Sequence, residues 1–234
     1  MNIALLGAEC TGKSTLAAAL VAHFNSTHTA ESAERSTASA PPRAGHVTEV
    51  LRAWCDRMGR TPLAHEQAAI AVLQEHAIQD AKAELGYPAV LVADTTPLMT
   101  AIYSLHYFQD ASLLPHALSV QRQFEHTLLM GLDLPWQADG IQRDGPVVRQ
   151  AIDNLLRTTL EQAGVPYRVI YGQGSARLQQ AVQALAYPPS ATPMLCTSHT
   201  SGDIGEIHHC AQCGNAWAER QLFSGLLSRQ DSKP

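Results

Sequence analysis

Residues 7–14, GAECTGKS, could bind a phosphate group through their backbone. They match the pattern G-x-x-x-x-G-K-[ST], in which the glycines let backbone N–H groups wrap closely around phosphate oxygens. In this pattern Lys13 bridges the β- and γ-phosphates of a nucleotide, and the Ser14 hydroxyl ligates Mg²⁺. We interpret Cys10 as a spacer in the loop and not as a nucleophile. The residues expected to bind the nucleotide are Gly7, Ala8, Glu9, Cys10, Thr11, Gly12, Lys13, Ser14 and Thr15.

Two acidic residues follow predicted strands and could act near a substrate hydroxyl. The run VLVAD ends at Asp94, so this carboxylate lies at the carboxyl end of a buried strand, where ligands bind in open α/β sheets. Asp94 could hold Mg²⁺ through water or accept a proton from an attacking hydroxyl. It could also cap the helix that follows. Glu49 has the analogous place at the end of the second predicted strand, where we expect it to contact substrate hydroxyls.

A polar segment, LPWQADGIQRDGPVVRQ at 134–150, could form a lid over the phosphates. Phosphoryl transfer requires stabilisation of the moving charge, often by arginines on a mobile loop. Arg143 and Arg149 are six residues apart, one in the loop and one in the next helix, so both could face the same phosphates. Trp136 could stack on an aromatic substrate ring or simply anchor the loop. The alternative interpretation is a solvated loop with ordinary ion pairs.

Metal-ligating residues gather near the end of the chain. Cys196 and His199 form C-x₂-H, and Cys210 and Cys213 form C-x₂-C. Four nitrogen and sulfur ligands suit tetrahedral Zn²⁺, and a closed site of this kind organises structure without catalysing a reaction. The pattern therefore predicts a structural zinc knuckle. His208 or His209 could replace His199 as the fourth ligand.

The elements that must position these residues alternate along the chain. Apolar runs predict strands at 1–6, 46–50, 89–94, 126–134 and 167–172. Helical patterns lie between and after them, at 13–24, 51–58, 62–85, 97–108, 119–124, 147–163 and 175–185. This alternation predicts an α/β fold of the P-loop NTPase type, with a five-stranded parallel sheet and helices on both faces.

Changes in composition divide the chain. We expect a P-loop domain at 1–186, a proline-rich linker at 187–193, and the zinc knuckle with a C-terminal helix at 194–234. That amphipathic helix could dock onto the first domain or onto a second subunit of a homo-oligomer. Residues 25–43, rich in Ser, Thr and Ala, predict a mobile insertion with at most a helical turn.

Composition narrows the class of protein. Of the 234 residues, 45% are hydrophobic and 16% are charged, which predicts a globular core. The formal net charge of −5 argues against general binding to nucleic acid or to an anionic membrane. The sequence shows neither a signal peptide nor an apolar run of membrane-spanning length, so we expect a cytoplasmic protein. The five cysteines then read as thiols or metal ligands.

Four segments, taken in order, resemble the kinase domain of NadR-type proteins, the nicotinamide riboside kinase part of bifunctional NAD-biosynthesis proteins. They are GAECTGKSTL, VTEVLRAWCDRMGRTPLAHEQ, ADTTPLMTAIYS and DLPWQADGIQRDGP, and the resemblance covers about residues 1–185. It implies transfer of the γ-phosphoryl of ATP to the 5′-hydroxyl of nicotinamide riboside or a similar riboside. It also implies that Lys13 and Ser14 handle ATP and Mg²⁺, that Asp94 lies near the hydroxyl and the metal, that Trp136 and Asp139 contact the substrate, and that Arg143 and Arg149 contact the phosphates.

The chain also departs from that family. It lacks the adenylyltransferase and helix-turn-helix regions of the bifunctional proteins, so adenylyl transfer and DNA regulation are not implied. A second hypothesis is therefore a regulatory ATP-binding protein or ATPase whose zinc module binds a partner. A nucleic-acid-linked ATPase is a weaker third hypothesis, because the chain is acidic and poor in lysine. A kinase needs Arg143 for transfer, whereas a switch needs mainly the phosphate loop.

Overall fold

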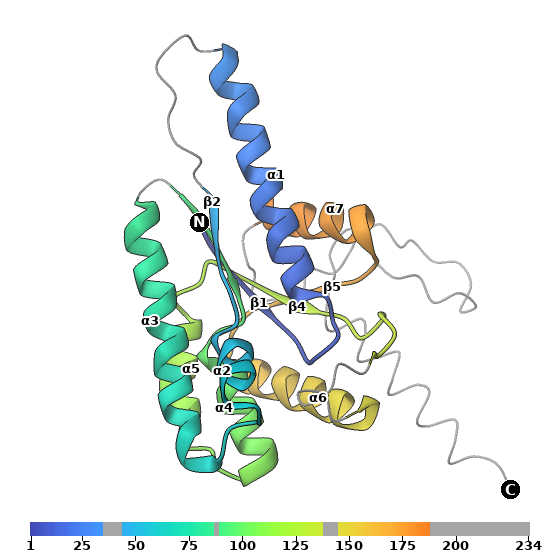
Figure 1. Cartoon of the computed structure of the whole chain (residues 1–234). Coiled ribbons are helices and arrows are strands. Elements are labelled where there is room, and N and C mark those ends of the chain that lie inside the picture. Colours follow the sequence, from blue (N-terminus) through green and yellow to red (C-terminus); the bar gives the residue numbers. More distant parts are fainter. Residues whose placement is uncertain (35–43, 87–88, 138–144, 188–234) are drawn as a thin grey trace, which may run out of the picture.

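The computed structural model describes residues 1–34, 44–86, 89–137 and 145–187. In this part of the chain, five parallel strands form one sheet in the order β2-β3-β1-β4-β5 (Figure 1). The strands are β1 (Asn2–Leu6), β2 (Ala44–Val47), β3 (Val90–Asp94), β4 (His126–Met130) and β5 (Arg168–Ile170). The predicted α/β fold and its five-stranded parallel sheet are confirmed.

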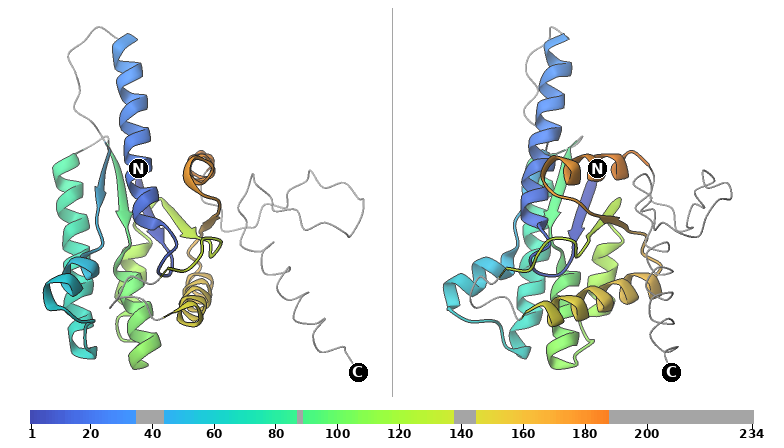
Figure 2. Two further views of the ribbon diagram at one scale, coloured as in Figure 1. Left: turned by 45° about the vertical axis from the view of Figure 1, so that its right-hand side comes forward. Right: turned by 90° about the vertical axis from the view of Figure 1, so that its right-hand side faces the viewer.

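Helices cover both faces of the sheet (Figures 1 and 2). They are α1 (Lys13–Glu34), α2 (Val50–Met58), α3 (Gln67–Leu85), α4 (Pro97–Phe108), α5 (Leu114–Gln121), α6 (Pro146–Gln162) and α7 (Gly174–Leu185), with a short 3₁₀ turn at Ala64–Glu66. Apolar residues of α1 and α7 pack on one face, and those of α4, α5 and α6 pack on the other. Because β1, β3 and β4 are covered on both sides, their sequences are continuously apolar rather than alternating.

The β1 strand is the centre of this arrangement. It pairs with β3 through Leu5 and Asp94 and with β4 through Leu6 and Leu129. The strand order changes direction around β1, so the segments that leave β1 and β4 diverge there. Such a switch point, at the carboxyl ends of the strands, is where open α/β sheets bind ligands.

The boundaries of α1 and α3 differ from the sequence-based expectation. Helix α1 continues to Glu34, ten residues beyond the predicted end, and so takes in the first part of the presumed insertion. The added segment contains neither Gly nor Pro and includes Ala and Glu, which favour helix. Helix α3 begins at Gln67 and not at Pro62. The Glu66 carboxylate accepts a hydrogen bond from the Leu63 N–H at 2.7 Å, which stabilises a turn where the helix was expected to start.

The boundaries of α5 also differ, whereas those of the other helices lie close to their predicted positions. Helix α4 has the predicted bounds, and α6 and α7 agree within one residue. Helix α5 lies at Leu114–Gln121, earlier than the predicted 119–124. Within the described residues, no helix combines the length and the apolar character needed to cross a membrane.

Candidate functional site

The loop between β1 and α1 has the backbone shape required to surround a phosphate. Gly7 and Gly12 have φ angles of 147° and 76°, and Cys10 lies between them at 56°. A Cβ atom on Gly7 would lie 3.0 Å from the Met130 Cβ, so only glycine fits against β4 without displacement. The Gly12 conformation likewise favours a residue without a side chain. Both the backbone angles and the close packing therefore require glycine at positions 7 and 12 of the loop.

Two side chains of this loop bond to its own carbonyl oxygens. The Lys13 Nζ donates to the carbonyl oxygens of Gly7 at 2.8 Å and Ala8 at 3.0 Å. The Thr11 hydroxyl also donates to the Ala8 oxygen, at 2.7 Å. Ser14 follows in the exposed first turn of α1, whose N-terminus carries positive potential. This arrangement suits an anion bound by backbone N–H groups, the Lys13 ammonium and the helix end.

Asp94 lies beside this loop as the sequence predicts. It ends β3 next to Leu5 of β1, and its side chain is buried at 2% exposure. Within the described residues its Oδ1 atom has no hydrogen-bond partner. The helix-cap alternative is wrong, because the Thr96 hydroxyl caps α4 by accepting from the Leu98 N–H at 3.3 Å. A buried carboxylate oxygen without a donor suits a site for Mg²⁺ or for a substrate proton.

Glu49 lies two residues beyond β2, at the N-terminus of α2, where its side chain makes no capping bond. Its carboxylate is 3.6 Å from Arg52. The buried Gln74 of α3 fixes the backbone on both sides, accepting from the Val50 N–H at 2.8 Å and donating to the Thr48 oxygen at 3.3 Å. The position of Glu49 is therefore set by a side chain 25 residues further along the chain.

Tyr103 is a residue that sequence reasoning missed. Burial raises the pKa of its hydroxyl, the carboxylates of Glu49 and Glu9 raise it further, and a hydrogen bond with the Glu9 backbone opposes them. Tyr103 therefore shares one neighbourhood with the phosphate loop and with the start of α2. Helical spacing could have indicated this residue, because Tyr103 lies seven residues after Thr96 and therefore on the same face of α4.

The segment after β4 forms two hydrogen bonds with the phosphate loop. The Trp136 Nε1–H donates to the Glu9 carboxylate at 3.2 Å, and the Cys10 Sγ donates to the Gln137 oxygen at 3.1 Å. Trp136 is thus placed beside the predicted nucleotide site. Asp139 and Arg143 lie outside the described residues, and their roles stay predictions.

Arg149 occupies the first turn of α6, buried at 5% exposure. Its Nη1 donates to the Leu134 oxygen at 2.8 Å, whereas its Nε and Nη2 have no partner within the described residues. In this conformation the guanidinium braces the segment after β4.

Two further residues missed in the sequence join three loops at this end of the sheet. Arg177 of α7 donates through Nη1 to the Thr11 oxygen of the phosphate loop and through Nη2 to Asp133 Oδ1 at 2.7 Å. Asp133 Oδ2 accepts from the Gly172 N–H at 2.6 Å. Burial lowers the pKa of Arg177 and Arg149 lowers it further, whereas Asp133 raises it.

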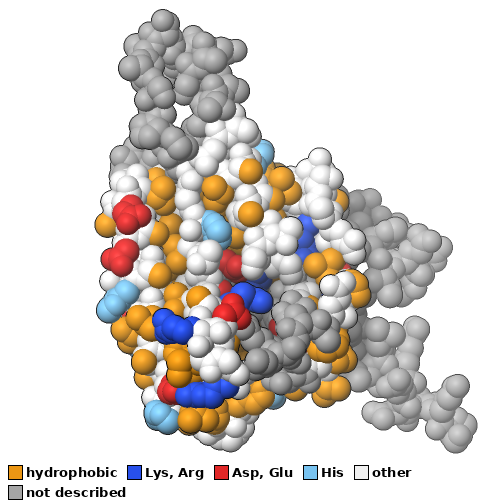
Figure 3. All heavy atoms as spheres, in the orientation of Figure 1, with side chains coloured by type: hydrophobic (Ala, Val, Ile, Leu, Met, Phe, Trp, Pro, Cys, Tyr) orange, Lys and Arg blue, Asp and Glu red, His pale blue; other side chains and the backbone are white. Residues whose placement is uncertain are grey.

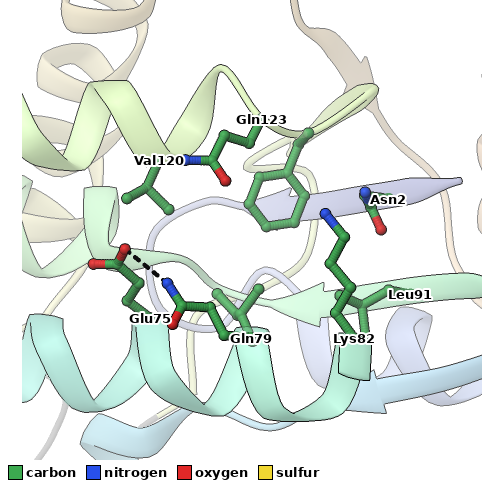
Figure 4. Close-up of a pocket in the computed structure, with 9 residues that line it drawn as sticks. Asn2, Glu75, Gln79, Lys82, Leu91, Val120 and Gln123 are labelled. Carbon is green, nitrogen blue, oxygen red and sulfur yellow. Dashed lines mark hydrogen bonds between the residues drawn. The ribbon is translucent and has the colours of Figure 1, made fainter. Parts of the chain in front are cut away.

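A small hollow of ≈ 80 Å³ lies elsewhere, between α3 and the end of α5 (Figure 4). Asn2 and Leu91 line it at the starts of β1 and β3, far along these strands from the phosphate loop. Lys82 extends from α3 toward it, and Gln79 donates to Glu75 at its rim at 3.1 Å. The hollow is too small for a nucleotide and is separate from the site described above.

The surface drawn in Figure 3 mixes acidic and basic side chains, and its described part shows no broad patch of one sign. A basic patch is the usual footprint of a nucleic-acid site. This face therefore agrees with the acidic balance of the sequence.

The predicted zinc ligands Cys196, His199, Cys210 and Cys213, and the alternatives His208 and His209, lie outside the described residues. Within residues 1–34, 44–86, 89–137 and 145–187, no three His, Cys, Asp or Glu side chains gather as a metal site. The zinc knuckle therefore stays a prediction, as do the linker and the proposed domain boundaries.

Comparison with known proteins identifies the family of the fold. A family model described as an AAA domain matches residues 2–177. A search of curated proteins finds no match.

Three solved structures match the chain at low identity. A NadR protein in complex with NR is 16% identical, with 80% of this chain and 50% of that chain covered, at a TM-score of 0.59. A NadR protein in complex with NAD and AMP-PNP is 13% identical, with 79% and 48% covered, at 0.54. A deoxyadenosine kinase from M. mycoides with bound dATP is 11% identical, with 80% and 100% covered, at 0.45. The chain thus spans about half the length of the NadR chains.

Proposed function

Because this chain belongs to the AAA-domain family of P-loop proteins, we propose that it is an ATP-dependent kinase that phosphorylates a riboside. The observation that carries the proposal is the buried Asp94 carboxylate, with one unpaired oxygen, beside the strand that leads into the phosphate loop. A loop alone would serve an ATPase or a switch equally well. A strand-end carboxylate adds a group that can act on an attacking hydroxyl.

The residues take the following roles in transfer. The loop N–H groups and the Lys13 ammonium hold the β- and γ-phosphates and offset their charge. The acceptor oxygen forms a bond to the γ-phosphorus while the bond between that phosphorus and the ADP oxygen breaks. The hydroxyl proton passes to Asp94. Mg²⁺, held by Ser14 and through water by Asp94, would supply further charge neutralisation.

Arg143 and Arg149 are proposed to stabilise the transferring phosphoryl group. Arg149 supports this role through two buried guanidinium nitrogens, Nε and Nη2, that have no partner within the described residues. These nitrogens could bind a phosphate oxygen while Nη1 keeps its bond to the Leu134 oxygen.

The proposed acceptor is nicotinamide riboside or a related riboside, phosphorylated at its 5′-hydroxyl. Support comes from the sequence resemblance to NadR-type kinases and from the acids and aromatic groups around the loop. Glu49 and Asp139 would bind ribose hydroxyls, and Trp136 and Tyr103 would line the base. ATP and Mg²⁺ are the implied partners of the reaction.

A panel of ribosides and nucleosides tests the proposal. Purified full chain with ATP and Mg²⁺ should release ADP when nicotinamide riboside or a close analogue is present, and Lys13→Ala should abolish the release. The control Lys82→Ala removes the ammonium of an exposed lysine on α3 and should leave the rate unchanged. Background ADP release with every member of the panel contradicts the kinase.

We further propose that residues 194–234 form a zinc knuckle joined by the linker 187–193 to the P-loop domain at 1–186. Support comes from the spacing of Cys196, His199, Cys210 and Cys213. With four protein ligands, zinc would organise this segment and leave phosphoryl transfer to the first domain.

A further inference from the structure

Arg177 has an unusual environment for a charged side chain. It is buried at 4% exposure in the first turns of α7, where the positive end of the helix dipole opposes a cation. Burial lowers its pKa, as expected for a guanidinium removed from water. Asp133, about one-third exposed, supplies the opposing charge at 2.7 Å. A cation kept in such a place requires a contact that a neutral residue would not make.

That contact is the carbonyl oxygen of Thr11, the residue before Gly12 in the phosphate loop. In a trans peptide the C=O and the following N–H point in opposite directions. A donor that holds the Thr11 oxygen on the outside of the loop therefore turns the Gly12 N–H toward the inside. The Gly12 φ of 76° belongs to this orientation.

The fit between Arg177 and the loop is close. A Cβ atom on Gly12 would lie 2.9 Å from the Arg177 Nη1 and 3.0 Å from the Leu134 Cδ1. The guanidinium thus occupies the space against which the loop turns. Asp133 fixes the guanidinium in that space and also binds the Gly172 N–H of the loop after β5.

We propose that Arg177 is a positioning residue that orients the Thr11–Gly12 peptide for phosphate binding, with Asp133 as the residue that holds it. The inference rests on the proposed binding of ATP by the loop. It assigns to α7 and to the β4–α6 segment a part in shaping the nucleotide site, although neither residue needs to touch the nucleotide.

Two variants of the full chain test this role by calorimetric titration with ATP and Mg²⁺. Arg177→Met should weaken ATP binding about tenfold, because an unheld peptide must be turned before its N–H can bind phosphate. Arg177→Lys should give an intermediate loss, because one ammonium cannot bridge Thr11 and Asp133 as the guanidinium fork does.

Arg168→Met is the matched control. Its guanidinium donates to the oxygens of Ala184 and Tyr187 at the other end of α7, so it removes an arginine–carbonyl contact remote from the loop. ATP affinity should be unchanged in this variant. Thermal unfolding identifies any variant that does not fold.

NMR of glycine-selectively ¹⁵N-labelled protein reports on the Thr11–Gly12 peptide directly. The chain contains 15 glycines, so the spectrum has few amide resonances. ATP should move the Gly12 amide resonance strongly downfield in the unaltered protein and much less in Arg177→Met. If that variant does not fold, Asp133→Asn takes its place, with several-fold weaker binding and a reduced Gly12 shift expected.

Unchanged ATP affinity and an unchanged Gly12 shift in a folded variant overturn the role of Arg177. Loss of affinity in Arg168→Met equal to that in Arg177→Met also overturns it, because the effect would then be general destabilisation. Failure of the unaltered protein to bind ATP is a different result, and it removes the proposed function itself.

Discussion

At the residue scale, Asp94 and Lys13 lie on neighbouring segments but differ in whether their charged groups have hydrogen-bond partners. The Lys13 ammonium is satisfied by two loop carbonyls, which it must release to bind phosphate. The Asp94 carboxylate retains an unpaired buried oxygen, which is costly unless a cation or a donor comes to it. Asp94 therefore favours a bound state that contains a metal or a hydroxyl, whereas Lys13 exchanges its carbonyl partners for phosphate oxygens.

This difference predicts separable effects of substitution. Asp94→Asn should lower kcat about 100-fold or more, because the amide does not take up the hydroxyl proton. The affinity for ATP without metal should change little, because the loop and Lys13 bind the phosphates. Steady-state kinetics and titration with metal-free ATP measure the two effects, and Glu84→Gln on the exposed part of α3 is the control. An unaltered kcat in Asp94→Asn would remove this residue from the chemistry.

The residues of the site were not equally visible in the sequence. The phosphate loop and Asp94 could be predicted because each is marked locally, by a motif and by the end of an apolar run. Tyr103, Asp133 and Arg177 could not, since their significance depends on partners brought close only by the fold. Arg177 lies 166 residues from Thr11 along the chain.

At the element scale, the start of α2 depends on α3. Gln74→Leu removes both hydrogen bonds to the backbone around Glu49, from the half-buried Val50 N–H and to the carbonyl of the exposed Thr48. We expect the free energy of unfolding to fall by about 1–3 kcal/mol. We also expect the KM for the acceptor to rise more than the KM for ATP, because Glu49 is displaced.

Gln79→Leu provides the control on the same helix, since the exposed Gln79 contacts only Glu75 among the hydrogen bonds described for its side chain. Chemical denaturation and steady-state kinetics compare the two variants. Equal rises in both KM values for Gln74→Leu would contradict a specific role in placing Glu49.

The turn before α3 predicts a dependence of stability on pH. Glu66 accepts two hydrogen bonds from Arg60 at 2.7 Å and one from the Leu63 N–H, and these bonds lower its pKa from 4.5 to about 2. A lowered carboxylate pKa stabilises the folded state fully above 4.5, and the gain is lost as the pH falls toward 2. Glu66→Gln should therefore lower Tm slightly at pH 7 and have a vanishing effect near pH 2.

Melting curves of both proteins across this range measure the difference, and it should respond to salt because the pair is partly exposed to solvent. A Tm difference that stays constant from pH 7 to pH 2 would contradict the assignment. The same bonds explain why the predicted helix start at Pro62 was wrong, because a side chain further along the chain stabilises a turn there.

Strands were more predictable than helix ends. The strands β1, β3 and β4 could be placed because buried parallel strands are continuous apolar runs. The strand β2 lacks such a run, and it lies at Ala44–Val47, two residues before the predicted start at 46. The end of α1 could not, because Ser and Thr are common to linkers and tolerated in helices. The intrinsic helix preference of these residues therefore does not decide whether such a segment is helix or linker.

At the scale of the whole molecule, an AAA domain spans most of the chain. The chain covers about half of the length of each NadR chain. The zinc knuckle proposed at residues 194–234 lies outside this domain, and it leads to a prediction of its own.

Mass spectrometry of the metal in purified protein should find about one zinc per chain, lost in Cys210→Ser but retained in Cys55→Ser. Cys55 is buried in α2 and lies far from the cluster in sequence, so it controls for loss of a thiol. A ratio well below one, unaffected by Cys210→Ser, contradicts the knuckle. Kinase activity should persist after zinc loss if the P-loop domain alone carries the chemistry.

Phosphoryl transfer to a small acceptor is the central claim, and product analysis tests it most directly. The full chain is incubated with ATP, Mg²⁺ and nicotinamide riboside, and phosphorylated riboside and ADP are quantified together by mass spectrometry. We predict equal amounts of the two products, formed only when acceptor and Lys13 are both present. ADP formed at the same rate without acceptor, or no phosphorylated riboside at saturating ATP, would contradict a riboside kinase and favour an ATPase or a nucleotide switch.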